Sequence, residues 1–361
     1  MRATHRRPPG TPDPDPLAGS RPAGDRFAGA RSAGDQSAGD RFADDPFAPL
    51  LALRGVVVLD GGLATQLEAQ GNSLADPLWS ARLLLENPGE IVRAHLAFYR
   101  AGAAVATTAS YQATFEGFAA RGIDRAGAID LLRRSVTLAS EARAAWRAER
   151  PPDDRSALLV AASIGPYGAF LANGGEYTGR YGRSVAQLRD FHRERLEVLV
   201  ATEADLLACE TIPELEEGMA LVELLDATPG ARGWLSFSCA DGAHLRSGAG
   251  VEEAFALAGQ SSRVLAVGVN CTAPEHIDEL LARARSVTSK PLVVYPNSGE
   301  GWDPVARRWI RAAGPTVDGS AARRWIEEGA IIVGGCCRVS PDQIEEVSAM
   351  VTTLARGRTD A

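Results

Sequence analysis

The sequence lacks any hydrophobic run that would cross a membrane, because no stretch of about 18 or more apolar residues occurs in it. It also has no excess of positive charge: 38 Lys and Arg are outnumbered by 46 Asp and Glu, which gives a net charge of −8. An acidic surface repels phosphate groups. We therefore expect neither a membrane nor nucleic acid as a partner.

Cysteine is scarce as well. Five cysteines in 361 residues are too few and too unevenly placed for a disulfide scaffold, and a chain of this length needs none. We expect some of them to bind a metal or to react as thiols. The sequence also lacks the glycine spacing of a dinucleotide-binding loop or a P-loop, and it has no apolar stretch typical of a signal peptide. A cytoplasmic protein is expected.

Residues 1–48 differ in composition from the rest of the chain. Ala-Gly recurs every five residues between positions 18 and 39, large apolar side chains are few, and seven Arg balance seven Asp. Such a segment cannot bury enough apolar surface to offset its chain entropy. We expect a disordered N-terminal tail over 1–48 and one folded domain over 49–361.

The folded domain alternates short apolar runs with segments of helical periodicity. The runs are continuous, which is typical of parallel strands covered on both faces. Segments such as 88–102 and 185–203 carry apolar residues at three- and four-residue spacing, which predicts helices. Eight such units predict a (β/α)8 TIM barrel, with a doubly wound open sheet as the alternative. The expected strands are 56–60, 103–108, 157–163, 204–210, 233–238, 264–270, 291–296 and 330–335.

In either fold the chemistry belongs at the carboxyl ends of the strands. Asp60 ends the first expected strand and Glu210 ends the fourth. Cys271 directly follows the sixth strand, and Cys336 and Cys337 follow the eighth, so three of the five cysteines are expected on one rim. Other residues at the strand ends are Thr108, Ser110, Tyr111 and Gln112 after the second strand, and Tyr295, Asn297 and Ser298 at the seventh.

Three thiolates on one rim predict a zinc site, since zinc is tetrahedral and suits thiolate ligands. Three protein ligands leave one position open, which is typical of a catalytic site. Neighbouring residues of a regular strand point to opposite faces, so Cys336 and Cys337 need a turn, which Gly334 and Gly335 would permit. The alternative is a closed structural site with Cys239 as fourth ligand. We interpret Cys209 as a core residue.

These residues together resemble the homocysteine S-methyltransferase family. The resemblance covers about residues 54–355 and includes the segments LDGGLATQLE (59–68), TTASYQATFEGF (107–118), SIGPYGAFLANGGEYTG (163–179), LLACETIPELEE (206–217), VGVNCTAPEHI (267–277), VVYPNSGEGWD (293–303) and IVGGCCRVSPDQI (332–344). The segments around Tyr111 and Tyr295 look like the branch of the family that uses S-methylmethionine.

The resemblance implies a (β/α)8 barrel that holds zinc through Cys271, Cys336 and Cys337 and transfers a methyl group from a sulfonium donor to homocysteine. S-methylmethionine is the first candidate donor and S-adenosylmethionine the second. Asp60 and Glu210 would accept the amino group of homocysteine. The implied substrate-binding residues also include Thr108, Ser110, Gln112 and Asn270, the residue before Cys271.

The long segment after the third strand is glycine-rich and aromatic, and we expect it to close over the site as a lid. Aromatic faces suit a sulfonium group. The candidate residues of the donor pocket are Tyr167, Tyr177, Tyr295 and Asn297, with Phe170 and Tyr181 nearby in the lid.

Other functions remain open at this stage. One alternative is methyl transfer to selenocysteine or another small thiol, and another is a homocysteine methyltransferase that uses betaine. A zinc-stabilised barrel that binds a ligand without catalysis is the alternative that is not an enzyme.

Overall fold

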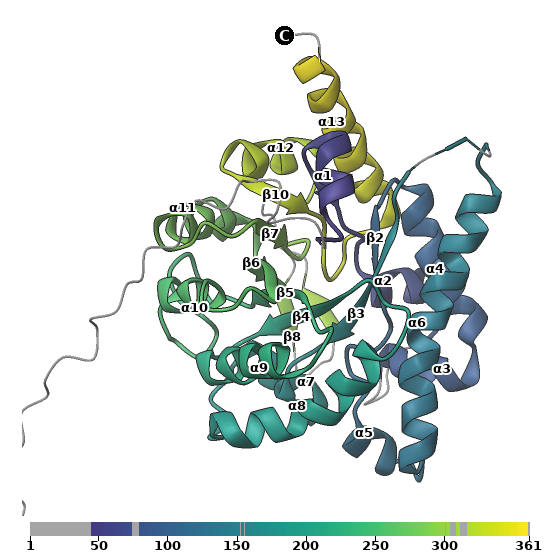
Figure 1. Ribbon diagram of the computed structural model, residues 1–361, viewed down its shortest axis with the longest axis vertical. Coiled ribbons are helices and arrows are strands. Elements are labelled where there is room, and N and C mark those ends of the chain that lie inside the picture. Colours follow the sequence, from purple (N-terminus) through teal and green to yellow (C-terminus); the bar gives the residue numbers. More distant parts are fainter. Residues whose placement is uncertain are drawn as a thin grey trace, which may run out of the picture. The chain divides into compact units, whose positions relative to one another are not determined.

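The computed structural model describes residues 45–73, 79–151, 153–154, 156–299, 301–303, 308–310 and 316–359, and Figure 1 shows their arrangement. The predicted disordered tail, residues 1–48, lies outside the described residues except for its last four. The predicted boundary between residues 48 and 49 therefore stays a prediction.

The described residues form a (β/α)8 barrel, as the sequence predicts. Eight parallel strands hydrogen-bond in the order β1-β10-β7-β6-β5-β4-β3-β2, and a bridge between Leu59 and Val105 joins the two ends of the sheet. The alternative of an open doubly wound sheet is wrong. Each barrel strand falls on an expected run: β1 (Val57–Val58), β2 (Val105–Thr107), β3 (Leu159–Ile164), β4 (Leu206–Ile212), β5 (Gly233–Phe237), β6 (Val264–Asn270), β7 (Leu292–Tyr295) and β10 (Ala330–Val333).

Helices surround the strands (Figure 1). The two helices predicted from periodicity are confirmed as α4 (Pro88–Arg100) and α8 (Val185–Val200), and Ser184 and Gln187 form a capping box that starts α8. The other helices are α1 (Ala48–Arg54), α2 (Leu63–Ala69), α3 (Leu83–Glu86), α5 (Phe115–Ala119), α6 (Arg125–Ala148), α7 (Tyr167–Leu171), α9 (Leu215–Ala227), α10 (Val251–Ala258), α11 (Ile277–Val287), α12 (Gly319–Glu327) and α13 (Pro341–Thr359), with 3₁₀ turns η2 (Trp79–Arg82), η3 (Gly175–Tyr177) and η4 (Pro274–His276).

The strands bury both of their faces, which explains their continuous apolar runs. Alternate residues such as Leu159 and Ala161 point into the barrel, whereas Val160 and Ala162 pack against the surrounding helices. Cys209 belongs to the outer layer and is fully buried, so its interpretation as a core residue is confirmed.

Helix α1 was not expected from the sequence. Phe47, directly before it, is buried and packs on Trp234 inside the barrel with ring centroids 6.3 Å apart. In Figure 1, α1 lies beside α13, from the other end of the sequence.

A second unexpected element is an antiparallel pair of β8 (Gly301–Asp303) and β9 (Arg308–Ile310) that follows β7.

In the part of the chain that the structure describes, no helix has both the length and the apolar character that crossing a membrane requires.

Candidate active site

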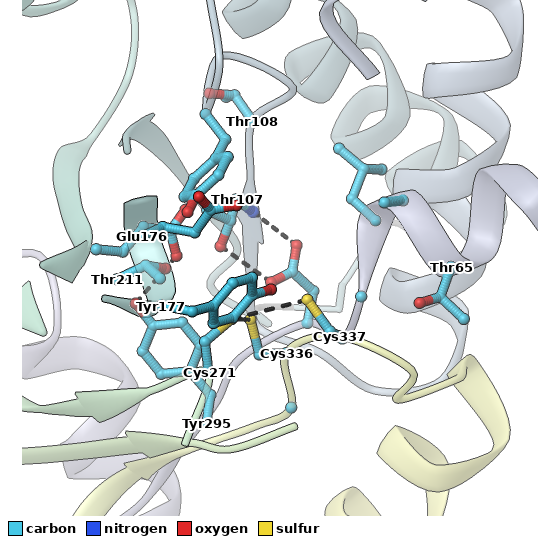
Figure 2. Close-up of a pocket in the computed structure, with 18 residues that line it drawn as sticks. Thr65, Thr107, Thr108, Glu176, Tyr177, Thr211, Cys271, Tyr295, Cys336 and Cys337 are labelled. Atoms are coloured by element: carbon cyan, nitrogen blue, oxygen red, sulfur yellow. Dashed lines mark hydrogen bonds between the residues drawn. The ribbon is translucent and has the colours of Figure 1, made fainter. Parts of the chain in front are cut away.

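A pocket opens at the carboxyl ends of the barrel strands, on the rim that the sequence analysis selects (Figure 2). Most of its walls come from the ends of β1, β2, β4, β6, β7 and β10, and the remainder from the start of α2 and the segment after β3. Its lining is Asp60, Gly61, Gly62, Leu63, Ala64, Thr65, Thr107, Thr108, Tyr111, Glu176, Tyr177, Glu210, Thr211, Cys271, Tyr295, Gly335, Cys336 and Cys337.

Three cysteines converge in this pocket. The Sγ atoms of Cys271, Cys336 and Cys337 all lie within 4.8 Å of one another, in a group that could hold a metal ion. Cys271 Sγ lies 3.7 Å from Cys337 Sγ and 2.6 Å from Cys336 Sγ. Two thiolates at zinc's bond length of ~2.3 Å lie about 3.8 Å apart in a tetrahedral site. The Sγ atoms of Cys271 and Cys337 already have this separation, whereas those of Cys271 and Cys336 would have to move apart by about 1 Å.

Cys271 reaches the pocket because the chain bends sharply at the end of β6. Its backbone is left-handed, with φ at 47°, and so is that of Thr211 on β4, with φ at 62°. The side chain of Asn270 links the two bends: its Oδ1 accepts from the Thr211 N–H, and its Nδ2 donates to Thr211 Oγ1, both at 2.7 Å. Asn270 Nδ2 also lies 3.8 Å from Cys336 Sγ.

Cys336 and Cys337 lie in a turn just past β10, as predicted. The N–H of Val339 donates to the Cys336 carbonyl at 3.2 Å, which closes the turn. Gly334 and Gly335 do not have the role that the sequence analysis predicts, however, because neither has a positive φ. A Cβ on Gly334 would lie 2.6 Å from the Cβ of Leu59, so glycine is needed there for close packing of β10 against β1.

Asp60 is buried at the end of β1. Its two oxygens accept the N–H of Thr107 at 2.7 Å and the hydroxyl of Thr107 at 3.0 Å. Burial raises the pKa of Asp60 to about 8, although both hydrogen bonds lower it.

Glu210 is the second buried acid and ends β4 within the pocket. Its Oε1 accepts the hydroxyl of Ser163, and its Oε2 accepts the Oη–H of Tyr295 at 3.0 Å. Burial raises the pKa of Glu210 to about 7. Tyr295 is itself fixed by Ser236 and by the indole N–H of Trp234, so Glu210 has a defined orientation.

The structure brings eight of the predicted site residues into the pocket lining and leaves five outside. Those inside are Asp60, Thr108, Tyr177, Glu210, Cys271, Tyr295, Cys336 and Cys337. Thr108 bonds to the hydroxyl of Ser110 at 2.7 Å, so its own hydroxyl is already engaged.

The other five predicted residues do not line the pocket but contact neighbouring segments of the rim through their side chains or main chains. Ser110 donates to the Ser163 carbonyl, and Gln112 donates to the Ala169 carbonyl. Asn270 joins β4 to β6 as described above. The Tyr167 ring packs edge-on against Phe191, and the N–H of Asn297 donates to the Thr272 carbonyl.

Sequence reasoning missed Glu176, which η3 places in the pocket. Its side chain is only 6% exposed, and burial raises its pKa to about 7. Thr65, Thr107 and Thr211 also line the pocket without having been expected. Glu176 is the one acidic residue in the run GAFLANGGEYTG (168–179). Its isolation among small and aromatic residues is the signal from which the sequence could have identified it as a site residue.

Cys239 does not join the three cysteines. It is buried at 1% exposure in the layer between barrel and helices, and its N–H donates to Thr272 Oγ1. The alternative of a closed four-cysteine site is therefore wrong. Fold and site together place the chain among (β/α)8 barrels whose rim carries an open three-thiol group suited to a soft metal ion.

Comparison with known proteins identifies the family within this class. Residues 57–351 match the family model of homocysteine S-methyltransferase, and the chain belongs to this family of enzymes. It is 46% identical over 300 residues to the homocysteine S-methyltransferase YbgG of Bacillus subtilis, which covers 83% of this chain and 95% of YbgG. It is 44% identical over 304 residues to the selenocysteine Se-methyltransferase of Brassica oleracea, with 81% and 88% covered.

A solved structure shares the fold. The metallated form of the homocysteine methyltransferase MmuM from Escherichia coli superposes with a TM-score of 0.76 at 46% identity, over 84% of this chain and 99% of MmuM. The expected resemblance to the homocysteine S-methyltransferase family is thus confirmed.

Proposed function

We propose that this enzyme transfers a methyl group from a sulfonium donor, S-methylmethionine or S-adenosylmethionine, to homocysteine and so forms methionine. The observation that carries the proposal is the convergence of Cys271, Cys336 and Cys337 beside buried acids in a chain of this family.

Zinc is the metal proposed for the three cysteines. Thiolates are soft ligands that favour zinc over magnesium or calcium, and three of them leave a position for a substrate sulfur. When bound, zinc lowers the pKa of a coordinating thiol and so supplies the acceptor sulfur as a nucleophile near neutral pH.

Glu210 and Asp60 are proposed to bind the amino group of homocysteine. Both acids lie on the same rim as the cysteines, and an ammonium ion would compensate the burial of a carboxylate. Ser163 and Tyr295 hold the two oxygens of Glu210, so its carboxylate is oriented before the substrate arrives.

The pocket has the electrostatic character that this reaction needs. Three acids line it, and no Lys, Arg or His is among its described lining residues. An anionic sulfur attacks the methyl carbon of a cationic sulfonium; the carbon–sulfonium bond breaks as the new carbon–sulfur bond forms, which leaves two neutral thioethers. Because charge disappears in this step, a pocket that excludes water favours it.

A selenol acceptor is the second candidate function. The similarity to the selenocysteine Se-methyltransferase supports it, since a selenol would occupy the same position as a thiol. No comparable similarity supports betaine as the donor. The alternative of a barrel without catalysis is not supported either, because the chain belongs to a family of enzymes.

The decisive experiment supplies the zinc-loaded full chain with homocysteine and, in turn, S-methylmethionine, S-adenosylmethionine and betaine, and measures methionine. We expect methionine with a sulfonium donor, its loss on chelation and its recovery with added zinc. The absence of methionine with both sulfonium donors would overturn the proposal. A parallel assay with selenocysteine compares kcat/KM for the two acceptors.

A further inference from the structure

Glu176 differs from the other acids of the pocket in its hydrogen bonding. Both oxygens of Asp60 and both oxygens of Glu210 accept hydrogen bonds from the protein. Glu176 Oε2, in contrast, is buried without a hydrogen-bond partner. A buried carboxylate oxygen without a donor is energetically costly, so its retention in a pocket needs an explanation.

The segment that carries Glu176 is fixed at both ends by helix α9. Glu217 accepts the N–H of Tyr167 at 2.6 Å, where the segment begins. Glu214 accepts the N–H groups of Arg180 at 2.7 Å and of Tyr181 at 3.3 Å, where it ends. Two carboxylates at the start of α9, Glu214 at its N-cap and Glu217 in its first turn, therefore hold both ends of the segment.

The backbone beside Glu176 is held as well. Ser238 Oγ donates to the Glu176 carbonyl at 3.2 Å. Gly168 packs so closely that a Cβ there would lie 2.4 Å from the Glu176 nitrogen. The unpartnered oxygen is thus a feature of a packed segment and not of a loose loop.

Aromatic rings share this side of the pocket. Burial raises the pKa of Tyr111 well above its usual value, and the charges of Glu176 and Cys271 add to the rise. Burial does the same for Tyr177, with contributions from Cys337, Cys271 and Glu176. Figure 2 shows Tyr177 alongside the three cysteines. The carboxylate, the rings and the thiols therefore lie within electrostatic range of one another.

We propose that Glu176 is the counter-charge for the sulfonium centre of the methyl donor and thereby selects a cationic donor. The proposal rests on the proposed function and adds a specificity-determining residue to it. Glu176 would hold the donor sulfur beside the faces of Tyr111 and Tyr177, on the side from which its methyl group meets the acceptor.

The missing hydrogen bond points to a sulfonium rather than an ammonium ion. A sulfonium has no N–H or O–H to donate, so it is recognised by negative charge and by aromatic faces. An ammonium suits oriented acceptors, and Asp60 and Glu210 provide these. Burial favours the neutral form of Glu176, and a cation bound beside its unpartnered oxygen would favour the charged form instead.

The proposal predicts a particular kinetic signature. The positive charge of the donor vanishes on the way to the transition state, so Glu176 stabilises the bound donor more than the transition state. Glu176→Gln should raise KM for the donor on the order of tenfold, with a smaller rise in kcat and no change in KM for homocysteine.

The sharpest test measures binding without turnover. S-methylmethionine and methionine share an ammonium and a carboxylate, and only the first carries a sulfonium. Calorimetry on the zinc-loaded full chain should show that the wild type prefers S-methylmethionine on the order of tenfold and that Glu176→Gln loses this preference. Glu176→Asp, which keeps the charge, should retain part of it.

Three results would overturn the proposal: a wild type with no preference, a Glu176→Gln variant with an unchanged preference, or an equal loss of affinity for both ligands, which would assign Glu176 to the ammonium. Zinc content and thermal unfolding of each variant identify a folding defect, and the exposed Glu275→Gln serves as the matched control. If the wild type binds as expected but forms no methionine, the proposed function fails and the assignment of Glu176 stands.

Discussion

Asn270 and Thr211 exchange two hydrogen bonds of 2.7 Å across the carboxyl ends of β6 and β4. The pair joins two left-handed residues, Thr211 and Cys271, and such a conformation costs roughly 1 kcal/mol or more for a residue other than glycine. Asn270 is fully buried, so it acts as a fixed link between the cysteine site and the neighbouring wall of the pocket.

Asn270→Ala should therefore weaken metal binding. Loss of the amide leaves the Thr211 N–H without its partner and frees the bend at Cys271. We expect zinc affinity to fall about 10–100-fold and the free energy of unfolding to fall by about 1–3 kcal/mol. Competition with a chromophoric chelator and urea unfolding measure the two effects. Ser236→Ala, which removes one bond to Asn270, should show a smaller loss; an unchanged zinc affinity in Asn270→Ala would contradict the prediction.

Alanine at Cys271, Cys336 or Cys337 should abolish zinc binding and methyl transfer together, because each is one of the three proposed ligands. Elemental analysis of the purified variants gives the zinc content. Cys239→Ala is the control, since Cys239 is a buried cysteine like Cys271 but lies outside the group. A control variant that also lost zinc would restore the four-cysteine alternative.

Glu210→Gln should change how stability depends on pH in the metal-free protein. Burial raises the pKa of Glu210 from 4.5 to about 7, so the folded state holds its proton more tightly than the unfolded state does. The wild type therefore loses stability as pH rises through this range, whereas the variant has no proton to lose there. The stability of Glu210→Gln relative to the wild type should rise between about pH 4.5 and 7 and then level off.

Urea unfolding of both proteins at pH 5, 6 and 8 gives this difference. Comparing the two proteins at each pH removes the contributions of the other titrating groups. Glu275→Gln, at an exposed position, is the control variant. A flat difference for Glu210→Gln would mean that burial does not raise the pKa of Glu210.

Gly168→Ala should impair donor binding through the position of Glu176. The added Cβ would meet the backbone of Gly175 and Glu176 at 2.5 and 2.4 Å, and backbone cannot move aside as a flexible side chain can. We expect a rise in KM for the donor of about tenfold or more, since small displacements in a site have large effects. Gly89→Ala meets no atom within 4 Å and should leave kinetics unchanged.

Phe47→Ala should destabilise the barrel even though Phe47 precedes the first strand. Its ring is 1% exposed and packs against Trp234 inside the barrel. Loss of a buried phenyl ring typically lowers the free energy of unfolding by about 3–5 kcal/mol. Leu53→Ala on α1, the helix that Phe47 precedes, should change the free energy of unfolding by less than about 0.5 kcal/mol, because Leu53 is 61% exposed.

The eight strands and the three cysteines were predictable because both depend on local order in the sequence. A run such as VLAVGVN (264–270) is apolar on both faces wherever it is placed, and Cys271 follows it directly. Parallel strands bring their carboxyl ends to one rim, so position in the chain was enough to bring Cys271 and Cys336 together.

The direction of polar side chains was not predictable in the same way. Ser110, Gln112 and Asn270 follow or end strands as expected, yet they bond to groups 53, 57 and 59 residues away along the chain. Buried polar groups must find partners, and partners that distant exist only once the barrel has closed.

The sequence by itself determined the barrel, the rim and the thiol group, because periodicity and strand ends are local properties. Only the tertiary structure decided that Glu176 faces the pocket and that Phe47 fills the barrel interior. Glu176 owes its position to contacts with Glu214, Glu217 and Ser238, and Phe47 owes its burial to Trp234. These contacts join segments that are remote in sequence, and folding alone brings them together.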